Sequence, residues 1–293
     1  MVFQPFGAED KDIFDKYFKE TDSRHCDMSF ASVYLWKGYY PCTYTIYDNM
    51  LIFKGEGEQV SFSFPIGAGD PAKAVEAILE FCEENKIQPA FHCLTRDHEI
   101  FLEEKYPGRF QFEFDRDEAE YVYECEKLIG LRGKKYHGKK NHVNKFKKSF
   151  QWAYEEISDE NREECIAMLA DWKDDNEDPG DDEKLAEVCA CKRALMEQES
   201  LGLLGGLIRA DGRVVAFTLA EKINSDTIVI HFEKAYSDVP GAYSIINQEF
   251  LIRNAQDIPY VNREEDRGDL GLRKAKESYH PIFLLENGYA YEK

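Results

Sequence analysis

The segment IHFEKAY, residues 230–236, contains two side chains that could exchange protons. His231 and Glu233 lie two residues apart in an apolar stretch that predicts a β-strand, and residues at that spacing point to one face of a sheet. A glutamate whose pKa is raised by burial can accept a proton from an attacking amine. Glu233 is therefore the candidate general base, and His231 is a candidate substrate-binding residue. The alternative is a glutamate on the strand surface that pairs with a lysine.

A second group of charges follows a short predicted strand, in the segment NREEDRGDLGLRKAKESYH at 262–280. Loops after strands commonly carry function, and alternating charges there could hold the amino and carboxyl groups of an amino acid. An arginine would grip the carboxylate or a phosphate through its planar fork. We take Asp266 as a second candidate catalytic residue; the candidate substrate-binding residues here are Asn262, Arg263, Glu264 and Lys274. The alternative is a surface charge network that caps the last helix, with Lys274 and Lys276 facing solvent.

Two hydroxyl groups lie at the start of the helix that is predicted after Gly241. Tyr243 and Ser244 could donate hydrogen bonds to the oxyanion of a tetrahedral intermediate. The sequence does not rank one above the other, so both are candidate substrate-binding residues.

One block of the chain is strongly basic although the protein is acidic. Residues 131–150 contain eight lysines and arginines, two histidines and no acidic residue, whereas the whole chain has 37 basic and 57 acidic residues and a net charge of −20. That charge disfavours general binding to nucleic acid, so a phosphate-bearing partner would have to be held locally. A basic cluster can do so, with a steep dependence on salt. The candidate phosphate- or RNA-binding residues are Arg132, Lys134, Lys135, His137, Lys139 and Lys140.

The second half of this basic block predicts a helix that begins at Lys140. Val143, Phe146 and Phe150 would form its apolar stripe. Lys139 would point into that stripe, so we place it before the helix. The alternative role of the block is a structural joint, with lysines that face solvent or the protein's own acidic surface. No carboxylate or cysteine stands at ligand spacing from its histidines, so no metal site is predicted.

The spacing of the cysteines and the length of the apolar runs indicate the cellular compartment. The eight cysteines are irregularly spaced and include no C-x-x-C pair, which is typical of free thiols in a reducing compartment. The start of the chain has no signal-peptide pattern, and the apolar runs are too short to cross a bilayer. We therefore expect a cytoplasmic protein without a transmembrane segment.

Hydrophobic periodicity and turn signals predict the same order of elements twice. In each half two helices precede three antiparallel strands, and a helix, a strand, a helix and further strands follow. Asp48–Asn49 and Asp211–Gly212 predict hairpin turns, and Asp70–Pro71 predicts the start of a helix. We therefore predict two similar α+β domains, at 1–128 and 129–293, with the basic block as their joint.

This order, together with three strings, resembles a known group of proteins. The strings are GKKYHGKKNHVNKF, GAYSIINQEF and VNREEDRGDLGLRKAKESYHP. They resemble a soluble bacterial family that is similar to the C-terminal domain of phosphatidylglycerol lysyltransferase. The resemblance implies two tandem GNAT-like (acyl-CoA N-acyltransferase-like) domains, each a mixed, mainly antiparallel sheet flanked by helices. It also implies kinship with the Fem-type aminoacyl and peptidyl transferases.

The resemblance implies a transferase that moves an aminoacyl group from charged tRNA, or from another phosphate-bearing acyl donor, to an amine or hydroxyl. The acceptor would be a small molecule or a lipid head group. GNAT acetyltransferases hold coenzyme A through Q/R-x-x-G-x-G/A at a helix start. Here residues 238–243 match only at Gly241, and Pro240 has no N–H to donate, so no cofactor is expected. Two alternatives stay open: an acyl-CoA-dependent N-acyltransferase, and a non-catalytic protein that binds phosphometabolites or RNA on this scaffold.

Overall fold

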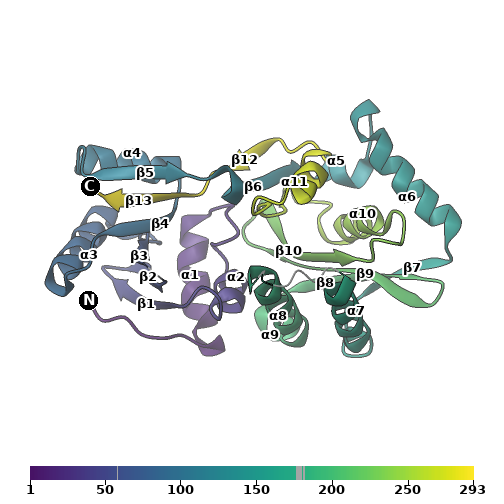
Figure 1. Ribbon diagram of the computed structural model, residues 1–293, viewed down its shortest axis with the longest axis horizontal. Helices are drawn as coiled ribbons and strands as arrows, with labels where there is room; N and C mark the ends of the chain where they lie inside the picture. Colours follow the sequence, from purple (N-terminus) through teal and green to yellow (C-terminus); the bar gives the residue numbers. More distant parts are fainter. Residues whose placement is uncertain (58, 176–179, 181) are drawn as a thin grey trace. The chain divides into compact units, whose positions relative to one another are not determined.

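The computed structural model describes residues 1–293 except 58, 176–179 and 181, and it forms two compact units (Figure 1). Unit 1 comprises Met1–Glu120, Glu265–Asp269 and Leu284–Lys293; unit 2 comprises Tyr121–Glu264 and Leu270–Phe283. The predicted division at 128/129 assumed contiguous halves, whereas the chain returns twice to unit 1. The acidic loop that the sequence predicts at 176–182 lies mostly outside the described residues.

Unit 1 is built on a six-stranded mixed sheet with the order β1-β2-β3-β4-β13-β5. β3 and β4 run parallel, and the other neighbours are antiparallel. The last strand of the chain inserts between β4 and β5, which explains why the C-terminal residues belong to this unit. The elements are η1 (Ala8–Asp10), α1 (Lys11–Thr21), α2 (Phe30–Trp36), β1 (Cys42–Tyr47), β2 (Met50–Glu56), β3 (Val60–Ser63), α3 (Pro71–Asn85), β4 (Ala90–Leu94), α4 (Arg96–Lys105), β5 (Phe110–Phe114), η2 (Arg116–Glu118) and β13 (Gly288–Glu292).

The two faces of this sheet carry separate apolar cores. Ile52 lies in the core formed with α3, which includes Ile78. The next residue, Phe53, packs edge-on against Phe14 of α1 and stacks with Phe18, at ring distances of 5.1 and 6.3 Å. Adjacent residues of a strand point to opposite faces, so β2 contributes to both cores.

The predicted turn and cap signals are confirmed. Asp48–Asn49 joins β1 to β2 with positive φ at both residues, and Asp211–Gly212 does the same between two strands of unit 2. Positive φ at both central residues is the conformation of the tight hairpin turn. The side chain of Asp70 accepts a hydrogen bond from the amide of Ala72 at 3.0 Å, and α3 begins between them.

Unit 2 contains most of a seven-stranded sheet with the order β12-β6-β11-β10-β9-β8-β7. β10 and β11 run parallel, whereas β10 with β9, β9 with β8, β8 with β7 and β11 with β6 are antiparallel. The mixed, mainly antiparallel sheets of both units confirm the predicted fold class. The elements are β6 (Glu120–Glu124), α5 (Cys125–Gly130), η3 (Lys134–Tyr136), α6 (His137–Ser149), β7 (Trp152–Glu156), α7 (Arg162–Asp175), α8 (Asp182–Met196), α9 (Gln198–Leu201), β8 (Leu204–Ala210), β9 (Arg213–Lys222), β10 (Thr227–Ala235), α10 (Ala242–Asn254), β11 (Tyr260–Asn262), α11 (Leu270–Glu277) and β12 (Phe283–Leu285).

Two neighbouring residues of β10 show which helices cover which face of this sheet. Glu233 accepts a hydrogen bond from Asn247 of α10 at 3.0 Å. Lys234 donates to Glu187 of α8 at 2.6 Å, and its ammonium lies over the ring of Trp172 of α7. Because adjacent strand residues point to opposite faces, α10 covers one face, and α7 and α8 cover the other (Figure 1). The candidate site lies on the α10 face.

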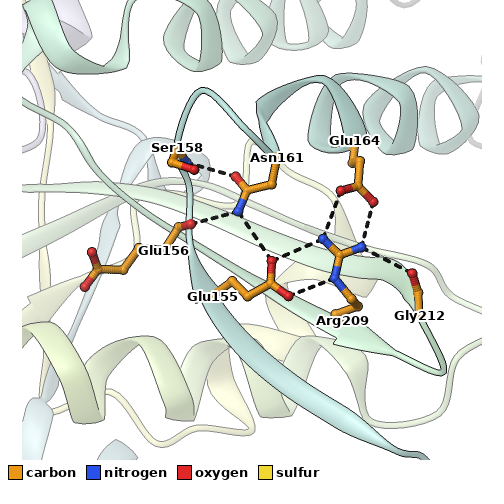
Figure 2. Close-up of polar contacts among 7 residues, drawn as sticks. All are labelled: Glu155, Glu156, Ser158, Asn161, Glu164, Arg209 and Gly212. Carbon is orange, nitrogen blue, oxygen red and sulfur yellow. Dashed lines mark hydrogen bonds and ion pairs between the residues drawn. The ribbon is translucent and has the colours of Figure 1, made fainter.

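An arginine clamp fixes the far edge of the same sheet. Arg209 of β8 grips Glu155 of β7 at 2.8 and 3.1 Å and Glu164 of α7 at 2.6 and 2.9 Å (Figure 2). It also donates to the carbonyl of Gly212, and Asn161 donates to Glu155. Bidentate pairs of this kind define geometry as well as contribute energy. The clamp therefore ties the edge strand, α7 and the β8–β9 turn together.

Candidate functional site

An ion pair between Glu233 and Arg263 lies at the centre of the candidate site. Arg263 Nη2 donates to Glu233 Oε1 over 2.7 Å, and the two side chains are only 12% and 9% exposed. Asn247 Nδ2 donates to the other carboxylate oxygen. Burial disfavours the charged guanidinium, but the negative charge of Glu233 outweighs this effect and raises the pKa of Arg263. Both oxygens of Glu233 are therefore engaged.

The second terminal nitrogen of Arg263 is different. Nη1 is buried and has no hydrogen-bond partner among the described residues. Leaving a buried donor unpaired costs about 1–3 kcal/mol, and more for a charged group. An oxygen atom of a bound ligand would satisfy it.

The ring of Tyr279 joins this pair to the basic block. Arg263 Cζ lies 4.7 Å from the ring centroid, and Lys139 Nζ lies 3.9 Å from the same centroid. The Tyr279 hydroxyl is 3.4 Å from Ser244 Oγ on α10. Aromatic faces attract cations in such positions. The ring therefore holds two cationic side chains, one from each of the segments that the sequence singled out.

Lys139 is partly buried here, and its proton is held less tightly than usual. Burial and the positive charge of Arg263 lower the pKa of the Lys139 ammonium to about 8, although Glu233 acts in the opposite direction. An amine that titrates near 8 can exchange protons close to neutral pH.

The predicted position of Lys139 before the helix is wrong. α6 begins at His137, three residues earlier than predicted, and Lys139 lies in its first turn. Val143 and Phe146 are buried as predicted, and Lys139 precedes Val143 by four residues, on the same side. A lysine is tolerated on this face because the Tyr279 ring receives its ammonium group.

Lys276 holds the backbone of the site in place. The expectation that it faces solvent is wrong. It is 8% exposed, and its ammonium donates to the backbone carbonyl of Arg263 over 2.6 Å. Its own carbonyl accepts a hydrogen bond from the hydroxyl of Tyr123, whose ring lies 5.8 Å from Arg263 Cζ. Lys276 thus fixes the backbone that presents the arginine. No sequence signal separates it from exposed Lys274.

His231 has a separate set of partners. Its ring nitrogens lie 2.9 Å from Glu221 and 2.8 Å from Glu264. Burial opposes a charge on the ring, but hydrogen bonds to the two carboxylates outweigh it and raise the pKa of His231 to about 10. An irregularity in β10 between Ile230 and Phe232 interrupts the strict two-residue alternation at this point. The charged histidine links β9, β10 and the segment after β11.

The two hydroxyl candidates at the start of α10 differ in exposure. Ser244 is buried beside Tyr279. Tyr243 is 39% exposed, and its hydroxyl accepts a hydrogen bond from Trp172 Nε1 at 3.1 Å. Ser244 therefore adjoins the site, whereas the hydroxyl of Tyr243 is engaged with α7.

The remaining predicted residues after β11 serve different purposes. Asn262 is fully buried and accepts a hydrogen bond from the amide of Glu264, which forms a tight turn. Lys274 is exposed on α11. Asp266 is fully buried in unit 1, where it accepts a backbone amide of its own turn and lies 3.5 Å from Arg116. It thus belongs to a different compact unit from Glu233.

Most of the basic candidates are solvated. Lys139 is the partly buried member of the predicted phosphate-binding set; the exposed members are Arg132, Lys134, Lys135, His137 and Lys140. The exposed side of α6 continues this basic surface with Lys145 and Lys148. The basic block therefore contains one residue that enters the site and a row of charges that faces water.

The turn before α10 is closely packed, and one of its amides is hydrogen-bonded within the turn. Gly241 has φ of +91°, and a Cβ there would lie 2.7 Å from the carbonyl oxygen of His142 on α6. The amide of Ala242 donates to the carbonyl of Val239 at 3.1 Å, and Pro240 has no N–H. At least these two positions of the turn therefore offer no amide to a pyrophosphate.

The whole-chain fold matches solved structures of tandem acyltransferase-like proteins. A protein of unknown function from Bacteroides thetaiotaomicron is 34% identical with a TM-score of 0.95, and the match covers 100% of both chains. The C-terminal domain of a putative lysylphosphatidylglycerol synthetase from Agrobacterium fabrum is 13% identical with a TM-score of 0.70, covering 98% of this chain and 92% of that one. A tandem GNAT protein from the clavulanic acid biosynthesis pathway is 8% identical with a TM-score of 0.53, over 99% and 98%. The protein thus has the tandem GNAT fold.

The family assignment follows from the sequence model. Residues 18–290 match the family described as phosphatidylglycerol lysyltransferase, C-terminal, and the chain belongs to that family. A protein of Mycoplasmoides gallisepticum is 25% identical over 173 residues, which is 57% of this chain and 54% of that protein, so the match spans about half of the relative's length. Every helix within the described residues is too short or too polar to cross a bilayer. The predicted family is confirmed.

Proposed function

We propose that this protein transfers an aminoacyl group from charged tRNA to an amine or hydroxyl acceptor, with the reacting groups in unit 2. Membership of the phosphatidylglycerol lysyltransferase C-terminal family supports aminoacyl transfer in general. The observation that carries the proposal is the buried, unpaired Nη1 of Arg263, on an arginine that shares the Tyr279 ring with the ammonium of Lys139. A donor and a group that titrates near neutrality are the two components that acyl transfer needs.

In the proposed reaction the acceptor attacks the ester carbonyl that links the amino acid to the tRNA ribose. The carbonyl oxygen gains negative charge and receives the hydrogen bond of Arg263 Nη1. The neutral amine of Lys139 takes the proton that the acceptor loses, and then returns it to the ribose oxygen as the ester bond breaks. The products are an acylated acceptor and a free tRNA hydroxyl, so protons and bonds balance without a further reactant.

Glu233 has a positioning role in this proposal instead of the predicted role as general base. Its two oxygens accept hydrogen bonds from Arg263 and Asn247, so it orients the guanidinium that faces the substrate. Lys139 replaces it as the proton acceptor because the pKa of Lys139 is about 8. Asp266 has no part in this chemistry.

The exposed basic residues of η3 and α6 supply the tRNA contacts in the proposal. Their side chains face solvent, and sequence-independent phosphate binding suits a donor that is recognised by its backbone. The turn before α10 gives little support to the acyl-CoA alternative, because Pro240 has no N–H to donate and the amide of Ala242 is bonded to the carbonyl of Val239. The acceptor can be a lipid head group or a small molecule.

The test is transfer of a radiolabelled amino acid from a charged tRNA pool to phosphatidylglycerol vesicles or to small amines. We expect an acylated product with the native protein and a loss of at least about 100-fold in Lys139→Met, as is typical when a proton acceptor is removed. Lys192→Met, which removes an exposed lysine of α8, is the matched control. An absence of both tRNA binding at low salt and product formation would refute the proposal.

A further inference from the structure

Unit 1 contains a second cluster of reactive side chains, which the proposed transfer reaction does not use. Cys26 and Asp27 precede α2, Cys93 lies in β4, and Glu120 begins β6. The sulfur of Cys26 and carboxylate oxygens of Asp27 and Glu120 all lie within 4.8 Å of one another. Cys93 Sγ lies 3.2 Å from Asp27 Oδ2. Two thiols and two carboxylates thus converge from three separate parts of the chain.

The surroundings of Glu120 hold its carboxylate in a fixed orientation. The side chain is fully buried, and it accepts hydrogen bonds from His25 Nδ1 at 2.8 Å, from the amide of Cys26 at 2.8 Å and from Asn287 Nδ2 at 3.2 Å. Metal-binding carboxylates in proteins are typically oriented by such outer contacts. Glu120 is therefore held in place near Cys26 and Asp27.

The backbone at Cys93 is unusual, and the pairing of β4 with β13 is irregular between Phe91 and Leu94. Cys93 has φ of +53°, in the left-handed region that non-glycine residues rarely adopt. It does so inside β4, where extended backbone would be the norm. Strained residues of this kind cluster at ligand clamps. Here the strained conformation brings the sulfur to Asp27.

We propose that Cys26, Asp27, Cys93 and Glu120 of unit 1 form a Zn²⁺ site. Ligand atoms around tetrahedral zinc lie roughly 3.4–3.8 Å apart, given zinc–sulfur and zinc–oxygen bonds of about 2.3 and 2.1 Å. The ligand atoms of Cys26, Asp27 and Glu120 lie within 4.8 Å of one another and must draw closer to reach this geometry. Cys93, which contacts Asp27, must turn further to join them. Paired thiolates exclude magnesium and calcium, which prefer oxygen ligands. The site therefore departs from the sequence-based expectation that no metal is bound.

Two thiolates and two carboxylates carry four negative charges, so the site with Zn²⁺ bound keeps a net negative charge. Each thiol gives up its proton when it binds the ion, so two protons are released for each Zn²⁺ bound. The four ligands leave no open coordination position, which is the pattern of a structural site. A metal ion there joins the segment before α2 to the β4 and β6 strands, and its binding energy adds to the stability of unit 1.

Two measurements on the full-length protein test this site. Metal analysis after purification with added zinc should find about one zinc per chain. Replacement of zinc by Co²⁺ should give a thiolate-to-metal charge-transfer band, and zinc should raise the thermal midpoint. In Cys26→Ser and Cys93→Ser the zinc content should fall at least about tenfold, whereas Cys189→Ser, which alters an exposed cysteine, should retain it.

The inference is overturned if the native protein binds less than about a tenth of an equivalent of zinc and shows no Co²⁺ thiolate band. It is also overturned if Cys189→Ser loses the metal while Cys93→Ser keeps it. The Co²⁺ spectrum of the unaltered chain decides the question even if a cysteine variant does not fold. Aminoacyl transfer is a separate readout, so its failure leaves this test unaffected.

Discussion

Removing the partly buried ammonium in the candidate site should make the protein more stable while it abolishes transfer. Lys139 has a pKa of about 8 against an ordinary value of 10.5. Its folded environment, through burial and the charge of Arg263, therefore disfavours the protonated form. At neutral pH the lysine is protonated in both the folded and the unfolded chain, so the unfavourable free energy is fully present. It disappears as the pH rises from about 8 to about 10.5, because the unfolded chain then binds more protons.

The magnitude follows from the difference between the two pKa values. At about 1.36 kcal/mol for each pKa unit, the full penalty would be about 3 kcal/mol. Lys139 is partly exposed, so solvent screening reduces this figure to about 1–2 kcal/mol. Lys139→Met retains the apolar stem that packs against Tyr279 and removes the charge. We expect its free energy of unfolding at pH 7 to exceed that of the native protein by about 1 kcal/mol or more.

Urea unfolding of the native protein, Lys139→Met and Lys140→Met provides the assay. Lys140 is the next residue along the helix and is exposed, so its replacement should change stability by less than about 0.5 kcal/mol. The difference between native protein and Lys139→Met should shrink as the pH is raised toward 10. A Lys139→Met variant that is less stable than Lys140→Met at pH 7 would refute the reasoning.

Three further predictions concern the framework. Arg209→Lys should lower the free energy of unfolding by about 1 kcal/mol at neutral pH. The hydrogen bonds of Arg209 to Glu155 and Glu164 lower the pKa of both carboxyls below the ordinary value of 4.5, so the difference from native protein in urea titrations should fade as the pH falls below that value. His231→Gln should be destabilised most below pH 6.5, and the loss should diminish as pH rises through about 10, the pKa of the native imidazole, when followed by denaturant unfolding across that range. Gly241→Ala should lower the thermal midpoint at a cost of about 1–3 kcal/mol, because its Cβ meets a carbonyl oxygen at 2.7 Å, whereas Gly138→Ala in α6, where a Cβ meets nothing within 4 Å, should raise it.

The sequence predicts the features of this fold that depend on local signals. The hairpin at Asp48–Asn49 and the cap at Asp70 follow from turn and helix-start preferences of single residues, and both are confirmed. The tandem fold followed from element order and from three strings, which were specific enough to identify the family. Element order does not reveal that β13 pairs with β4 and β5, because that pairing is a non-local contact.

The candidate site was harder to predict because its important properties arise from tertiary contacts. Glu233 and Arg263 were identified from charge next to predicted strands, but their ion pair joins residues that are 30 apart in sequence. Lys139 and Lys276 look like any lysines in a charged segment. Their burial depends on Tyr279 and on the carbonyl of Arg263, and hydrophobic periodicity carries no information about either.

The pH dependence of single-turnover transfer from charged tRNA tests the central claim most directly. With native protein the rate should rise with pH and level off with an apparent pKa of about 8, the value of Lys139, as expected when a neutral amine takes the acceptor's proton. Lys139→Met should be at least about 100-fold slower and should lose this titration, while charged tRNA still binds. Transfer at the native rate, with an unchanged pH profile in Lys139→Met, would contradict the account.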